Sequence, residues 1–134
     1  MGMYTELVLK CSIMEDVPDD VRLVLRHLFK QGAKPFNLPD HEFFKCPRWD
    51  FIGSGSSFYH HPQALTHYWT GHGDADNRGG NLFSRSDLKN YDGEIEKFID
   101  WLMPYIDEEE GQCIGWSWYE EETEPTLLYK KVAA

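Results

Sequence analysis

The sequence has few cysteines and no long apolar run. Its 134 residues include three cysteines, an odd number at wide spacing, which favours reduced thiols over a disulfide framework. No apolar run approaches the roughly 18 residues needed to span a bilayer. The N-terminal stretch MGMYTELVLK also lacks the apolar core of a signal peptide. We therefore expect one domain in the cytoplasm, with no membrane partner.

Positive charge is also scarce. The chain has 13 Lys and Arg against 23 Asp and Glu, a formal net charge of −10. Between Asp92 and Glu124 twelve acidic residues accompany one base, Lys97, so this stretch carries 1 − 12 = −11 and the remainder +1. Such a local negative field disfavours nucleic acid on this face and speeds encounter with a basic partner. A solvated surface that only keeps the protein soluble is the simpler interpretation.

Two segments show the apolar spacing of amphipathic helices. In the second, Asp92 is the expected N-cap and Pro104 is expected to end or kink the helix near Met103. The apolar stripes are Val21, Val24, Leu25, Leu28 and Phe29 in the first helix, and Ile95, Phe98, Ile99, Leu102 and Ile106 in the second.

Six segments have the composition of strands: Tyr4–Ile13, Trp49–Tyr59, Ala64–Thr70, a segment from Asn81, Gln112–Glu120 and Pro125–Lys131. We predict an α+β fold, a single domain over residues 1–134 with two helices packed on a mainly antiparallel sheet. One interpretation is a degenerate βαββ duplication, with halves 1–70 and 81–134 joined by a glycine-rich loop. Amphipathic helices also resemble one another by chance, because burial demands the same stripe.

Tryptophan and tyrosine are more numerous than one small core needs. Period-two alternation places Ile114, Trp116 and Trp118 on one face of their strand, either in the core or along a cleft. Aromatic residues beside acidic ones are typical of interface anchors. The binding candidates are Tyr59, Trp69, Glu108, Glu109, Trp116, Trp118, Tyr119, Glu120 and Glu121.

Motifs for catalysis or metal binding are weak. His60, His67, His72 and Asp74 are weak metal candidates, since the chain has neither HExxH nor CxxC and adjacent strand residues point to opposite faces. Cys46 follows His41 within one loop but lacks the electropositive setting of a reactive thiol. We therefore predict no catalytic residue and no cofactor.

The segments LPDHEFFKCPRW, SRSDLKNYDGEIEKFIDWLMPYI and EPTLLY resemble a group of small proteins encoded in phages, prophages and related mobile elements. That group has no assigned activity, so the resemblance transfers no catalytic residue. The paired βαββ layout is also similar in topology to effector-binding domains of the gyrase-inhibitor type, and fold alone does not fix function.

Three functions are compatible with these observations. The first is a non-catalytic acidic binding protein that engages a basic surface of a host protein in the bacterial cytoplasm, through an acidic, aromatic-rich face. The second is a small-molecule binding domain with an aromatic cleft between the two halves. The third is a metal-dependent enzyme built on the region from His60 to Asp76. Edge strands and surplus aromatics are also compatible with a homodimer.

Overall fold

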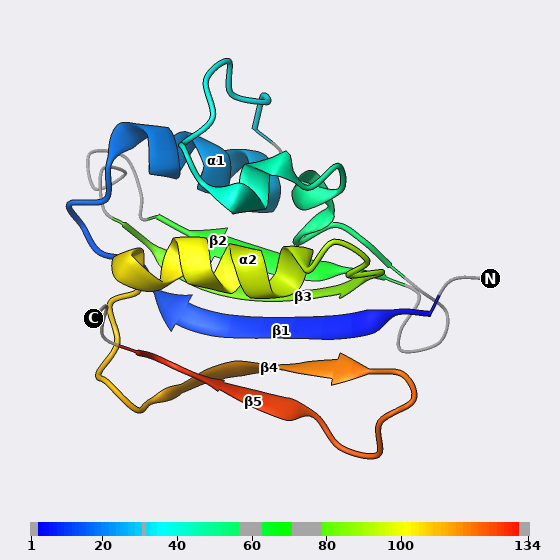
Figure 1. The fold of residues 1–134 in the computed structure, drawn as a ribbon. Helices are drawn as coiled ribbons and strands as arrows, with labels where there is room; N and C mark the ends of the chain where they lie inside the picture. Colours follow the sequence, from blue (N-terminus) through cyan, green and yellow to red (C-terminus); the bar gives the residue numbers. More distant parts are fainter. Residues whose placement is uncertain (1–2, 31, 57–62, 71–78, 132–134) are drawn as a thin grey trace.

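Strand β1 (Thr5–Ser12) lies at the centre of a five-stranded sheet in the computed structural model, which describes residues 3–30, 32–56, 63–70 and 79–131. The sheet order is β2-β3-β1-β4-β5, and every pairing is antiparallel. The predicted α+β fold is thereby confirmed (Figure 1). The other elements are α1 (Asp19–Phe29), β2 (Leu65–Trp69), β3 (Asn81–Leu88), α2 (Glu94–Leu102), β4 (Cys113–Tyr119) and β5 (Thr126–Tyr129).

The connectivity β1-α1-β2-β3-α2-β4 is the split βαβ arrangement called ferredoxin-like, and β5 extends the sheet by a hairpin. The two halves therefore share a βαβ unit, and only the second adds another strand. The strand expected at Trp49–Tyr59 is wrong at its start, because Trp49–Phe51 forms a 3₁₀ turn. Residues 57–59 of that expected strand lie outside the described residues. Trp49 is buried against Phe43 and Phe44, and that packing replaces strand alternation.

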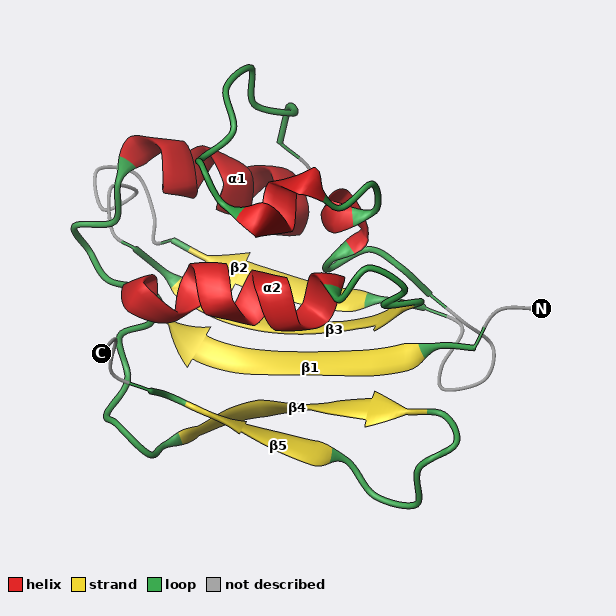
Figure 2. Ribbon diagram, viewed as in Figure 1, coloured by secondary structure: helices red, strands yellow, loops and turns green. Residues whose placement is uncertain are grey.

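Both helices lie on one face of the sheet (Figure 2). All five stripe residues of α1 are buried, as predicted, whereas Ile99 of α2 is only half-buried. The α2 helix ends at Leu102 and continues as a 3₁₀ turn containing Pro104, which confirms the predicted stop. None of the helices in the described ranges is long and apolar enough to cross a membrane.

The predicted N-cap Asp92 is wrong. The cap position is Gly93, with φ of 69° and no side-chain cap. Instead, Asn90 Oδ1 accepts a hydrogen bond from the Ile95 backbone N–H at 2.9 Å, and the buried Glu94 carboxylate accepts from the N–H groups of Asn90 and Asp92 at 3.1 Å each. The Asn90 and Glu94 side chains thus accept the hydrogen bonds of the backbone N–H groups in this turn, so the Asp92 side chain has no capping role.

Candidate binding surfaces

A β-bulge in β4 decides which way the predicted aromatic residues face. Cys113 pairs with Tyr129 and Gly115 with Leu128, so Ile114 is an extra residue relative to β5. Because a bulge breaks the period-two alternation, Ile114 enters the core while the next tryptophans face the other way. The prediction that Ile114, Trp116 and Trp118 share a face is therefore wrong.

Trp116 belongs to a row of side chains that crosses all five strands on the face away from the helices. The register pairs Leu65 with Arg85, Arg85 with Val8, Val8 with Trp116, and Trp116 with Leu127. Trp118, Phe83, Trp69 and Tyr129 lie on the same face by alternation along their strands. We call this side of the sheet the open face.

Large apolar side chains on the open face are exposed to solvent. An antiparallel sheet whose second face meets water normally alternates apolar and polar residues, so this composition requires an explanation. The exposed fractions are 50% for Leu65, 39% for Trp69, 44% for Phe83, 49% for Leu127 and 43% for Tyr129. Of these five residues only Trp69 is among the binding candidates predicted from the sequence. The signal for Phe83 and Leu127 is their alternation with Leu82 and Leu128, which are buried or half-buried on the other face.

Hydrogen bonds fix both tryptophans of the open face. The Trp116 indole N–H donates to Glu6 Oε1 at 3.2 Å, which draws its ring across the sheet toward β1. The Trp118 indole N–H donates to the Glu122 carbonyl at 2.8 Å, in the turn between β4 and β5. Side chains held in one orientation lose less entropy on binding than mobile ones, and both tryptophans are held in this way.

A charged cluster lies at the centre of the open face. Arg85 Nε lies 2.6 Å from Glu6 Oε2, and Arg85 Nη2 lies 3.0 Å from Asp87 Oδ1. Arg85 Nη1 also donates to the Gln63 carbonyl at 3.1 Å. The side chains of Glu6, Arg85 and Asp87 are at most 14% exposed. Because Arg85 is paired with both carboxylates and joins β3 to β1, the cluster holds these strands in register and has a structural role.

The acidic residues do not gather in one patch. Glu108 accepts a hydrogen bond from the Ser12 N–H at 2.7 Å, and Glu120 accepts one from the Tyr4 N–H. These two carboxylates therefore bind opposite ends of β1 and have structural roles. The exposed Glu109 and the exposed Glu121 flank β4, whose seven residues separate them by roughly 20 Å at about 3.3 Å per residue. Tyr119, on the helix side, donates to Met3 Sδ at 2.8 Å.

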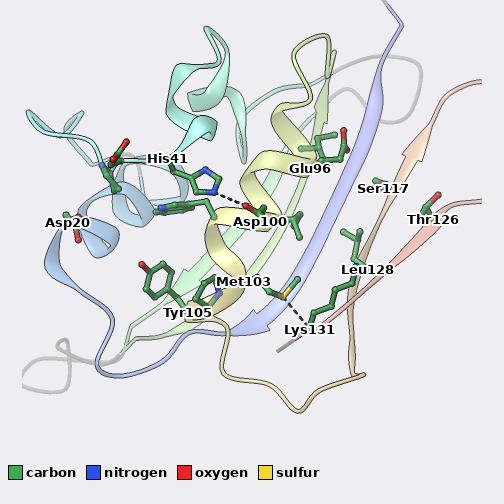
Figure 3. Close-up of a pocket in the computed structure, with 16 residues that line it drawn as sticks. Asp20, His41, Glu96, Asp100, Met103, Tyr105, Ser117, Thr126, Leu128 and Lys131 are labelled. Atoms are coloured by element: carbon green, nitrogen blue, oxygen red, sulfur yellow. Dashed lines mark hydrogen bonds and ion pairs between the residues drawn. The ribbon is translucent and has the colours of Figure 1, made fainter. Parts of the chain in front are cut away.

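A groove of about 1110 Å³ runs along α2 on the helix side of the sheet. Figure 3 shows Ser117, Thr126 and Leu128 of the hairpin on one side of α2, and His41 and Tyr105 on the other. The cleft predicted between the halves thus has a counterpart, but its aromatic lining is Trp101 and Tyr105. The tryptophans at 116 and 118 lie on the opposite face of the sheet.

The described residues contain no candidate metal site. Among them, no group of three or more His, Cys, Asp or Glu is placed to hold a metal ion. His67 is exposed on the open face; the other candidates, Tyr59, His60, His72 and Asp74, lie outside the described residues.

His41 and Cys46 have structural partners. His41 Nδ1 accepts from the Phe43 N–H at 3.0 Å, so the neutral ring carries its proton on Nε2 and donates it to Asp100 at 2.9 Å. Both ring nitrogens are occupied. The Cys46 thiol contacts the carbonyl oxygens of Glu42 and Asp92, and burial raises its pKa. A buried thiol with a raised pKa is not the thiolate that a reactive cysteine needs.

Comparison of the chain with protein families, with curated proteins and with solved structures finds no match.

Proposed function

We propose that this protein is a non-catalytic binding protein, which docks a partner protein on the open face of its sheet. The observation that carries the proposal is the row from Leu65 through Trp116 to Leu127, which presents exposed apolar side chains at both edges of the sheet. Aromatic side chains with a polar handle, such as Trp116 and Trp118, are typical anchors of protein interfaces.

Charge favours a basic partner. The turn that follows Trp118 carries Glu121, Glu122 and Glu124, all exposed, and none of them forms an ion pair within the described chain. Glu109 and Glu110 are exposed at the other end of the same hairpin. A partner with an apolar centre and lysine or arginine at its rim complements this arrangement, and rim charges accelerate association.

The resemblance to proteins of phages and prophages makes a host protein in the bacterial cytoplasm the partner we expect. Since Glu108 and Glu120 bind the backbone of β1, the neighbouring carboxylates that bind no backbone are those available to a partner. The proposal therefore keeps the basic partner predicted from the sequence and moves the main contact from the acidic runs to the open face.

The test compares two double variants in affinity capture from a lysate of a bacterial host. Phe83→Ser with Leu127→Ser removes apolar surface from the open face. The control Leu23→Ser with Phe36→Ser removes exposed apolar surface elsewhere, since Leu23 and Phe36 are 52% and 105% exposed. We expect basic proteins to be retained by the wild type and the control, to be released by salt, and to be lost with the open-face variant.

Sedimentation of the purified protein completes the test. We expect the wild type to be a monomer. The proposal is overturned when the open-face variant captures the same basic proteins as the wild type. It is equally overturned when the wild type is a dimer that the open-face variant dissociates, because the occupant of the open face is then a second copy of the chain.

A further inference from the structure

The groove beside α2 is an empty position in the helix layer. The helices α1 and α2 lie over β2, β3 and β1, and the β4–β5 hairpin extends beyond α2 (Figure 1). The helix-side floor of this hairpin carries small or half-buried groups, Ser117, Thr126 and Leu128. The groove above these groups has room for the side chains of another element.

Comparison of the two helices shows which flank of α2 lacks a neighbour. The shared apolar stripe aligns Leu25 with Ile99 and Phe29 with Met103, at a constant offset along the chain. Leu25 and Phe29 are 0% and 6% exposed, whereas Ile99 and Met103 are half-buried and line the groove. The second helix therefore keeps an apolar flank that its counterpart buries completely.

A contact between the hairpin and the end of α2 bounds one end of the groove, and the other end continues into a second hollow. Lys130 Nζ donates to the Met103 carbonyl at 2.7 Å, which ties the end of the hairpin to the end of α2. At the opposite end a second hollow of about 240 Å³ shares Glu96 and Ser117 with the groove and reaches Tyr119 and Glu122. The trough follows the nine residues of α2, roughly 13 Å at about 1.5 Å per residue, which is the length of two to three helical turns.

The charges around the trough are mainly negative. Carboxylates of Glu96 and Asp100 on α2 line the groove, and Glu122 lines its continuation. The cations are Lys131 in the groove and Lys89 in the continuation, and Lys89 Nζ already lies over the ring of Tyr4 at 5.6 Å. An apolar floor with an acidic rim complements a helix that is apolar on one side and basic on the other.

We propose that this trough binds a basic amphipathic helix of a partner protein, as a second site on the side of the sheet opposite the open face. The apolar side of the helix packs on Ile99, Met103 and Leu128, completing the helix layer over the hairpin. Its lysine or arginine side chains approach Glu96 and Asp100. The flexible Met103 side chain adapts to the shape of the incoming residues.

The test uses a labelled peptide of about 18 residues, long enough to be helical, with leucine on one side and lysine on the other. Binding is measured by fluorescence anisotropy. A peptide of equal composition in scrambled order has no apolar stripe and controls for charge alone. We expect saturable binding of the amphipathic peptide and clearly weaker binding of the scrambled one.

Two pairs of variants locate the site. Thr126→Trp fills the groove floor at an exposed position of β5, and Leu23→Trp introduces the same side chain at an exposed position of α1, outside both proposed surfaces. Glu96→Gln with Asp100→Asn lowers the groove charge, and Glu109→Gln with Glu110→Gln removes the same charge elsewhere. We expect the first member of each pair to lose or weaken binding several-fold and the second to bind as the wild type does.

Nuclear magnetic resonance gives a readout that does not depend on the folding of any variant. Methyl signals of Ile99 and Met103 are expected to shift when the peptide is added, while those of Leu65 and Leu127 stay in place. The proposal is overturned by equal binding of the scrambled peptide, by wild-type affinity of folded Thr126→Trp, or by shifts confined to the open face. The peptide assay reports on the trough and the lysate capture reports on the open face, so failure of one proposal is distinguishable from failure of the other.

Discussion

The Trp116 indole nitrogen lies 3.2 Å from Glu6 Oε1. The other oxygen of the same carboxylate lies 2.6 Å from Arg85 Nε. One side chain of β1 thus joins β4 to β3 across the centre of the open face. Because Glu6 pairs in register with Asp87 and Trp118, a slip of one residue would break these contacts together.

Arg85→Met is expected to destabilise the protein by about 3–5 kcal/mol, because Glu6 and Asp87 are left buried without their cation. Urea unfolding followed by circular dichroism measures this change. The control is Lys45→Met, which removes a cation paired with Glu42 where both side chains are about 70% exposed, and should leave the free energy of unfolding nearly unchanged. Equal losses in the two variants would contradict a structural role for the cluster.

Gly115→Ala is expected to cost about 3 kcal/mol or more. Gly115 has φ of 149°, and a Cβ added there would lie 1.9 Å from the Val8 carbonyl oxygen in the neighbouring strand. Gly111 also has positive φ, 88°, but open space around it, so Gly111→Ala should cost only about 1–2 kcal/mol. Thermal unfolding of both variants checks the difference, and similar melting temperatures would mean that the close strand approach is not required.

Glu94→Ala is expected to destabilise the protein by about 2–3 kcal/mol, since two backbone N–H groups lose their acceptor. Asp92→Ala, at the residue that sequence patterns favour as the cap, should change stability by less than about 0.5 kcal/mol. Chemical denaturation of the two variants decides between the positions. A larger loss from the change at residue 92 would restore the capping role predicted from the sequence.

One of the three cysteines is expected to react quickly with a thiol reagent in the folded protein. Cys113 is exposed, whereas Cys11 and Cys46 are buried. Burial, and then the charge of Glu108, raises the pKa of Cys11 to about 12, so this thiol stays protonated and unreactive even near pH 10, where free thiols are largely ionised. Colorimetric labelling should count one fast thiol, abolished by Cys113→Ser, and three after unfolding. Fast labelling of two or more thiols would contradict this burial.

The apolar periodicity of the sequence determined the helices and the α+β class. The stripes from Val21 to Phe29 and from Ile95 to Ile106 face the core, because a helix of this pattern can bury only one side. Proline at position 104 determined where α2 ends, since its ring cannot continue the helix. These are local effects, and local sequence is sufficient for them.

Only the tertiary structure decided which side chains became surface. The single extra residue at Ile114 turns Trp116 and Trp118 away from the core, and a bulge depends on the strands that pair on both sides. Glu108 and Glu120 belong to the acidic runs of the sequence, but their carboxylates bind the backbone at the two ends of β1, about a hundred residues away along the chain. Contacts between such distant segments exist only after the sheet has formed, so a periodic pattern along the chain does not encode them.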